Sequence, residues 1–127
     1  MASPDPIGRG LSAASIAPAI DGQQAFVSSS AGVYRLEAPL TFATAPLLRQ
    51  PGLGRIEAAS DAVEFDLQHV PASDSAGLAL LIDWLAEARA RQRTLRYVQV
   101  PEALRALARL SEVESLIAPQ GKDNGRS

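Results

Sequence analysis

The chain has 127 residues, and its 12 Lys and Arg against 14 Asp and Glu give a net charge of −2. It contains no cysteine and one histidine, which excludes disulfides, thiolate chemistry and metal sites that need cysteine or several imidazoles. With this charge balance and 5% aromatic residues, it has neither the positive field nor the stacking platforms of a nucleic-acid binder. No apolar run approaches the length of a membrane span, so no direct membrane insertion is expected.

The composition predicts one domain between two tails. Residues 1–23 are rich in Ala, Ser and Pro and lack a sustained period, and residues 119–127 are polar, so both segments are predicted to be disordered. A secretory signal is disfavoured because Pro18 interrupts a stretch that is only weakly apolar. Residues 24–118 are predicted to fold as a single domain.

Strand and helix signals alternate along this domain. Four short apolar or alternating segments predict strands, and the turn-like residues 29–32 make the first two a hairpin. The predicted strands are Ala25–Ser28, Val33–Leu36, Val63–Leu67 and Leu95–Val100. With the helices between and after them, the order β-β-α-β-α-β-α-α predicts an α/β fold. We expect a mostly parallel sheet of four to five strands, packed by three to four helices.

The helix signals differ in strength. Thr44 is a candidate N-cap for a short helix that Pro51-Gly52 should break or kink early. The longest helix is predicted from Ser75 to about Gln92.

Two further helices are predicted near the end of the domain. Pro101 begins a helix with one apolar face, formed by Leu104, Leu107, Ala108 and Leu110. Residues 111–114, Ser-Glu-Val-Glu, form a capping box that should open a last short turn.

The most informative segment is Asp-Ser-Ala-Gly-Leu at residues 74–78, where the longest helix begins. Ser73 or Asp74 can cap the free N–H groups of this helix, and a carboxylate also meets the positive end of its dipole. Gly77 indicates that another backbone, or a partner, approaches closely. From the residues alone, plain capping by Asp74 and Ser75 remains an alternative to a functional role. Nucleotide binding is disfavoured because Asp74 would repel a phosphate.

No catalytic arrangement is predicted. Ser75 would need a base, and His69 is the single imidazole, with no Gly-x-Ser-x-Gly sequence around the serine. Asp83 and Glu87 share a helix face, but Arg91 makes a solvated pair with Glu87 the simpler interpretation. We therefore expect no catalytic residue, no cofactor and no metal site.

The segment at 74–78 resembles the signature of the STAS domain, the family of anti-sigma-factor antagonists and of domains appended to sulfate transporters. The match rests on a strand that ends in Asp66-Leu67, a short loop, and Asp-Ser-Ala-Gly-Leu opening a helix. Residues 41–46 and 101–107 look like the same family, so the resemblance implies the STAS fold over the whole predicted domain. Within the family, residues 74–81 followed by Trp84-Leu85 are most similar to the MlaB group. Its members are small cytoplasmic subunits of the ABC transporter that maintains outer-membrane lipid asymmetry.

That resemblance implies a non-catalytic subunit that binds an MlaF-like ATPase and stabilises or regulates it. Through this ATPase it would meet a permease and a membrane-anchored substrate-binding subunit, as a cytoplasmic protein peripheral to the inner membrane. The alternative is an anti-sigma-factor antagonist that is controlled by a kinase-type anti-sigma factor. Antagonists carry their phosphorylated Ser or Thr immediately before the motif glycine, where this chain has Ala76. The hydroxyl lies one place earlier, at Ser75, where MlaB-type proteins keep theirs, which favours the transporter subunit.

The long helix suggests where a partner would bind. Leu78, Leu81, Ile82 and Leu85 form one stripe that should face the sheet. At about 100° per residue, Leu80 and Trp84 fall near the opposite side, close to Ala76. We expect Trp84 to be at least partly solvent-accessible; the alternative is that it packs against a flanking helix. The predicted partner-binding residues are Asp74, Ser75, Ala76, Gly77, Leu80, Trp84, Thr41 and Thr44.

Overall fold

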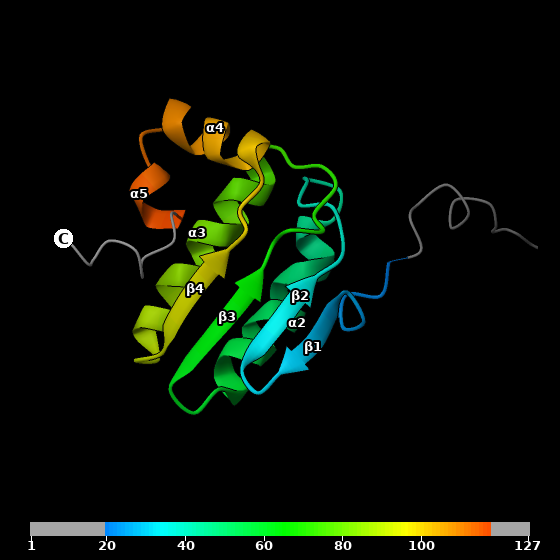
Figure 1. Cartoon of the computed structure of the whole chain (residues 1–127), viewed down its shortest axis with the longest axis vertical. Helices are drawn as coiled ribbons and strands as arrows, with labels where there is room; N and C mark the ends of the chain where they lie inside the picture. The colour runs from blue at the N-terminus through cyan, green and yellow to red at the C-terminus, as the bar shows by residue number, and fades with distance from the viewer. Residues whose placement is uncertain (1–19, 118–127) are drawn as a thin grey trace, which may run out of the picture.

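The structure, a computed structural model, describes residues 20–117. The disordered tails predicted for residues 1–23 and 119–127 lie outside the described residues, except for residues 20–23. Strands and helices follow one another in the predicted order (Figure 1). They are β1 (Phe26–Ser30), β2 (Val33–Leu36), α2 (Ala45–Ala58), β3 (Ala62–Asp66), α3 (Ser75–Ala90), β4 (Thr94–Val98), α4 (Glu102–Leu110) and α5 (Glu114–Ile117).

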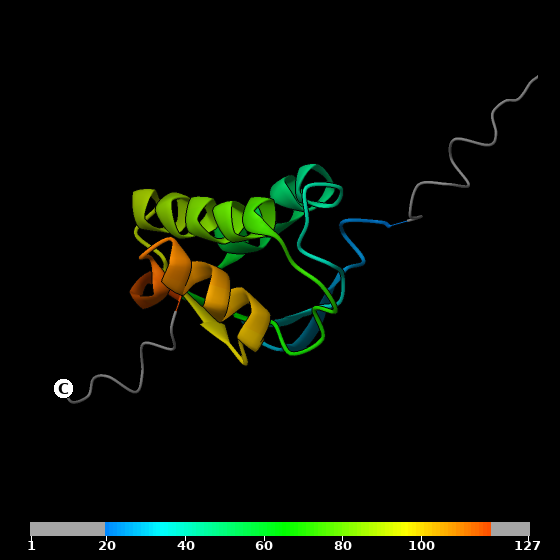
Figure 2. The ribbon, with the colours of Figure 1, turned by 90° about the horizontal axis from the view of Figure 1, so that it is seen from above.

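The strands of this range form one sheet in the order β1-β2-β3-β4. β1 and β2 are an antiparallel hairpin, whereas β2 with β3 and β3 with β4 are parallel. Figures 1 and 2 show α2 and α3 side by side over one face of the sheet, and α4 and α5 pack against α3. The predicted α/β fold, with a mostly parallel sheet and an N-terminal hairpin, is confirmed.

Trp84 lies in the centre of the core, so the expectation that it is solvent-accessible is wrong. Its exposed fraction is 0%, and that of Leu80, one turn earlier, is 5%. The physical reason is that α3 packs on the sheet and on α2 at once, so the indole lies between strand residues and Gly52 of α2. The indole ring meets Phe26 and Phe65 edge to face, and its Nε1 donates a hydrogen bond to the carbonyl of Arg49 at 3.1 Å. The alternative, packing against a flanking helix, is confirmed.

Helix α2 continues through Pro51-Gly52 to Ala58, so of the predicted break or kink the break is wrong. Gly52 faces α3, and a Cβ at this position would overlap the ring of Trp84. The glycine therefore makes room for the tryptophan between the two helices. Pro51 has no N–H for the carbonyl of Leu47, and Gly22 lies against that carbonyl so closely that a Cβ on Gly22 would overlap it.

The segment before β1 is also fastened to α2 through polar contacts. The guanidinium of Arg55 donates to the side-chain oxygen of Gln23 at 2.6 Å and to its backbone carbonyl at 2.8 Å. The same guanidinium lies over the rings of Phe26 and Tyr34. Arg55 thus joins the start of the described chain, the hairpin and α2.

The apolar stripe of α3 and the last two helices agree with the sequence in part. Of the predicted stripe of α3, Leu78 and Leu81 are buried, whereas Ile82 and Leu85 are only half-buried. Leu104 is buried on α4, but Leu110 is 84% exposed, because a residue six positions later is rotated by about 240° on a helix. The expected capping box is replaced by a different arrangement, in which Ser111 ends α4 and the Glu114 carboxylate pairs with arginines of α4.

Two glycines of α2 form a matched test of the packing around Trp84. Gly52→Ala should lower the free energy of unfolding by about 1–3 kcal/mol, because the new Cβ overlaps a ring in a filled core. Gly54→Ala should raise it by about 0.5–1 kcal/mol, since no atom lies within 4 Å of that Cβ and alanine favours the helix. Urea unfolding measures both changes, and equal effects of the two substitutions would contradict this packing.

The burial of Trp84 has a spectroscopic consequence. The chain has one tryptophan, so its fluorescence reports on this position alone. The folded chain should show blue-shifted emission that iodide or acrylamide quenches little, and unfolding in urea should shift the emission to the red. Free N-acetyltryptophanamide is the control for quenching. Strong quenching of the native chain would place Trp84 at the surface instead.

Candidate functional site

Two loops meet at the carboxyl ends of the parallel strands. The loop after β2 and the loop after β3 pair through their backbones, with Leu40 N–H donating to the carbonyl of Ala72 at 2.9 Å. Asp74 N–H returns a hydrogen bond to the carbonyl of Leu40 at 3.0 Å. The start of α3 is therefore fixed to the segment that leads into α2.

Gly77 makes this approach possible. A Cβ at Gly77 would overlap the carbonyl of Leu40, so any larger residue would push the loop after β2 away from α3. The close approach that the sequence indicated is made by the chain's own backbone. Gly77 is buried, and a partner does not reach it without rearrangement.

The carboxylate of Asp74 holds both segments at once. Its Oδ1 caps α3 by accepting from Ala76 N–H at 2.9 Å and from Gly77 N–H at 3.1 Å. Its Oδ2 accepts from Phe42 N–H at 3.1 Å, across the junction. The hydrogen bond from Phe42, followed by those from Gly77 and Ala76, lowers the pKa of the Asp74 carboxyl, while desolvation opposes them. Of the two N-cap candidates considered, Asp74 performs the capping.

The two threonines of the loop after β2 have structural contacts. Thr44 is 1% exposed, and its hydroxyl donates to the carbonyl of Pro39 at 2.6 Å and accepts from Thr41 N–H at 3.0 Å. Thr44 precedes α2 as expected, but its side chain makes no cap hydrogen bond to that helix. Thr41 is half-buried beside it. Thr44 therefore shapes the loop and presents no surface to a partner.

Ser75 is the exposed polar residue at the tip of α3. Its hydroxyl makes no hydrogen bond to any other residue between 20 and 117, because Asp74 already caps the helix. Ala76, next to it, is half-buried. Among the predicted partner-binding residues, Asp74, Ser75, Ala76 and Thr41 reach the surface, whereas Gly77, Leu80, Trp84 and Thr44 are buried. Because these last four residues are buried, the expectation that they contact a partner at the surface is wrong.

Two apolar hollows flank this tip. One, of about 390 Å³, lies between α2 and α3. It is lined by Phe42, Ala45, Pro46, Arg49, Ala76, Ala79, Leu80 and Asp83. The other, of about 610 Å³, lies between the tip and α4. It is lined by Ser73, Asp74, Ser75, Ala103, Ala106, Leu107 and Leu110. Sequence reasoning missed Phe42 and Leu110, because no local pattern places them beside Ser75.

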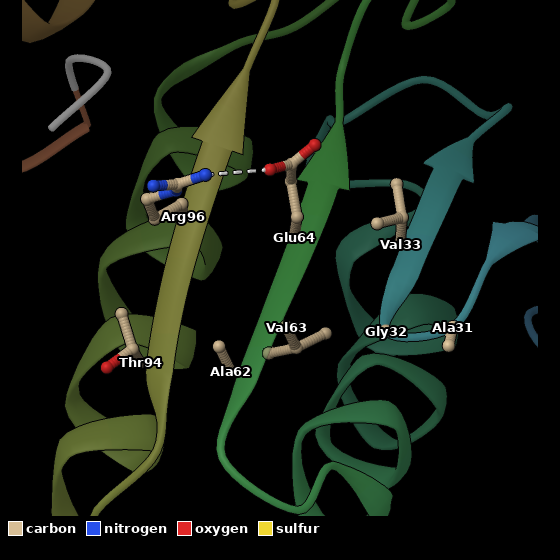
Figure 3. A pocket seen from close by; sticks show the side chains of 8 residues that line it. All are labelled: Ala31, Gly32, Val33, Ala62, Val63, Glu64, Thr94 and Arg96. Carbon is tan, nitrogen blue, oxygen red and sulfur yellow. Dashed lines mark hydrogen bonds and ion pairs between the residues drawn. The ribbon is translucent and has the colours of Figure 1, made fainter. Parts of the chain in front are cut away.

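A different hollow, of about 250 Å³, lies on the face of the sheet turned away from α2 and α3 (Figure 3). Glu64 and Arg96 cross it with an ion pair of 3.1 Å between β3 and β4. Ala62 and Thr94 place this hollow where the two strands begin, whereas Ser75 follows the end at which they finish. Because its two charges pair with each other, the hollow has no convergent set of free polar groups.

The carboxylates considered for catalysis are engaged in ion pairs between α2 and α3. Arg49 binds Asp83 at 2.9 Å and Glu87 at 3.4 Å, and Glu87 also pairs with Arg91, as the sequence predicted. In the part of the chain that the structure describes, no cluster of His, Asp or Glu could hold a metal ion. Across the same residues, no helix combines the length and the apolar character needed to cross a membrane.

Comparisons with known proteins place the chain in a family. The family model described as "Mlab, STAS domain" matches residues 27–118, so the chain belongs to the STAS domain family and is of the MlaB type. Its fold is similar to that of the unphosphorylated anti-sigma-factor antagonist SpoIIAA, with a TM-score of 0.58. That match has 14% identity and covers 80% of this chain and 90% of the other, so it shows the fold alone. No curated protein matches the sequence. STAS domains are generally non-catalytic regulatory or interaction domains.

The hydrogen bonds of Asp74 predict a pH dependence. Its pKa is lower in the folded chain than the ordinary value of 3.8, so the carboxylate stabilises the fold above pH 3.8. This stabilisation is lost as the pH falls through the folded pKa. Asp74→Ala should therefore lower the thermal midpoint at pH 7, and the difference from wild type should narrow in acid.

Two companion variants sharpen this measurement. Asp74→Asn keeps an oxygen that can cap α3, but its amide nitrogen cannot accept from Phe42 N–H. Its thermal midpoint should therefore lie between those of wild type and Asp74→Ala. Asp61→Ala removes an exposed carboxylate and should change the midpoint at pH 7 little. A difference between wild type and Asp74→Ala that stays constant down to pH 3 would contradict the role assigned to this charge.

Proposed function

We propose that this chain is a non-catalytic subunit that binds the ATPase of a phospholipid-transporting ABC complex and stabilises or regulates it. The observation that carries the proposal is the exposed hydroxyl of Ser75, which makes no hydrogen bond within the described chain and is set directly before Ala76. The family match of the MlaB type supports the transporter over other roles of STAS domains. In this proposal the complex is one that maintains outer-membrane lipid asymmetry.

The geometry suits recognition by a partner protein. Asp74 uses its oxygens on the backbone of two segments, and Gly77 lets these segments touch. Ser75 is therefore held on a fixed helix end, while its own hydroxyl stays available to donate or accept a hydrogen bond. A preorganised contact of this kind loses little conformational freedom on binding.

The position of the hydroxyl also argues against control by phosphorylation. Ala76, which precedes the motif glycine, has a methyl group and cannot accept a phosphate. A phosphate on Ser75 would add close to two negative charges beside Asp74, with no arginine of residues 20–117 paired to that carboxylate. Ser75 therefore acts, in this proposal, as an unmodified hydroxyl. The chain would lie in the cytoplasm, peripheral to the inner membrane, with the permease and the membrane-anchored substrate-binding subunit as indirect partners.

Substitution of Ser75 separates binding from folding. Ser75→Ala should change the free energy of unfolding by less than about 0.5 kcal/mol, because the residue is exposed and Asp74 provides the cap. The same variant and Ser75→Asp should bind the MlaF-like ATPase of the same organism more weakly, as measured by calorimetry with purified full-length proteins. Ser60→Ala, at another exposed serine, is the control and should bind as wild type does.

The alternative function has its own arm in the experiment. The wild-type chain is also mixed with a kinase-type anti-sigma factor and ATP. Binding to this kinase with phosphorylation of Ser75, and no binding to the ATPase, would replace the transporter subunit by an anti-sigma-factor antagonist. If wild type, Ser75→Ala and Ser75→Asp bind the ATPase with equal affinity, Ser75 takes no part in that binding.

A further inference from the structure

Exposed apolar side chains are concentrated around Ser75. Phe42 is 76% exposed and Leu110 is 84% exposed, which makes them the two most exposed large apolar residues of the described chain. They lie on the two sides of the tip, one in the hollow that includes Ala76 and the other in the hollow that includes Ser75. Leu47 and Leu116, at 44%, line neither hollow.

The backbone that carries Phe42 is held in place from both sides. Its N–H donates to Asp74 Oδ2 at 3.1 Å, and the residue before it, Thr41, donates to the hydroxyl of buried Thr44. The ring is therefore presented by a fixed loop and is left largely in water. Aromatic residues, phenylalanine among them, are enriched in protein–protein interfaces relative to the rest of the surface.

Leu110 is held out by the way α4 sits on the core. Leu104 and Ala108 are fully buried, and Leu110 is rotated away from them at the end of the helix. Between Leu110 and Ser75 the hollow is lined by the small residues Ala103 and Ala106 and by half-buried Leu107. This side of the tip therefore offers a partner side chain a shallow apolar hollow.

Between the two hydrophobic residues lies the carboxylate of Asp74, whose hydrogen bonds all come from backbone N–H groups. The nearby acids Asp83 and Glu102 are neutralised by Arg49 and Arg109 respectively. Asp74 has no such partner among residues 20–117. A complementary surface therefore needs apolar contacts at two places and a basic side chain between them.

We propose that Phe42 and Leu110 are the two apolar anchors with which the chain binds its ATPase, and that a basic side chain of the ATPase faces Asp74 between them. The inference rests on the proposed function and adds residues outside the signature at 74–78. Because both side chains are exposed to water in the free chain, their burial by a partner contributes favourable hydrophobic free energy to binding. No contact inside the fold has to be broken for this.

Affinity measurements with matched variants test the two anchors. Phe42→Ser and Leu110→Ser should each weaken ATPase binding about tenfold or more, with an unchanged thermal midpoint. Leu47→Ser and Leu116→Ser, which also replace exposed leucines, should bind as wild type does. Equal losses in all four variants, or none in the first two, would overturn the anchors while the binding of wild type still supports the proposed function. No binding by wild type would overturn both.

Thiol labelling identifies what covers the surface. The chain has no cysteine, so Phe42→Cys, Leu110→Cys, Leu47→Cys and Leu116→Cys each carry a single thiol. In the free full-length chain all four should react readily with maleimide, and saturating ATPase should slow labelling at positions 42 and 110 alone. Slow labelling of 42 and 110 without ATPase would assign the surface elsewhere: to a second copy if it depends on concentration, or to the chain's own termini if it does not.

Discussion

The contact between the carbonyl of Leu40 and the first turn of α3 determines the geometry of the whole functional end. The two backbones touch because Gly77 has no side chain, and Asp74 then bonds to both of them through its N–H and its carboxylate. This contact joins two loops that are more than thirty residues apart in sequence. Ser75 and Phe42 share one surface for this reason, although neither bonds to the other.

The sequence predicted the fold well because its signals were local. Period-two segments identified the strands, and the run from Ser75 identified the long helix within two residues of its observed end. The predicted exposure of Trp84 was wrong because a helical wheel gives the direction of each side chain on one helix but does not say which element lies in that direction. The packing of α2 on α3 also explains why Pro51-Gly52 does not end the helix. A proline and a glycine predict a break locally, whereas in the fold the glycine accommodates the indole ring of Trp84.

Of the binding surface proposed for this chain, the sequence indicated Asp74, Ser75 and Ala76 but not Phe42 or Leu110. Asp74, Ser75 and Ala76 are consecutive, so a motif can reveal them, and the cap at Asp74 follows from its place before the helix. Phe42 and Leu110 come from separate segments, and their exposure depends on how α2 and α4 sit beside α3. Thr44 was predicted to bind a partner, but its hydroxyl makes its hydrogen bonds within the loop after β2.

The contacts of Gly22 and Gln23 with α2 bear on where this domain begins. Similarity to the family starts at residue 27, yet Gly22 covers the carbonyl that Pro51 leaves without a donor, and Gln23 accepts twice from Arg55. A fragment cut at the limit of similarity would open the middle of α2 to water and release an arginine that lies over Phe26 and Tyr34. The folding unit is thus larger than the homologous segment, and the extra residues complete a helix that comes after them in the chain.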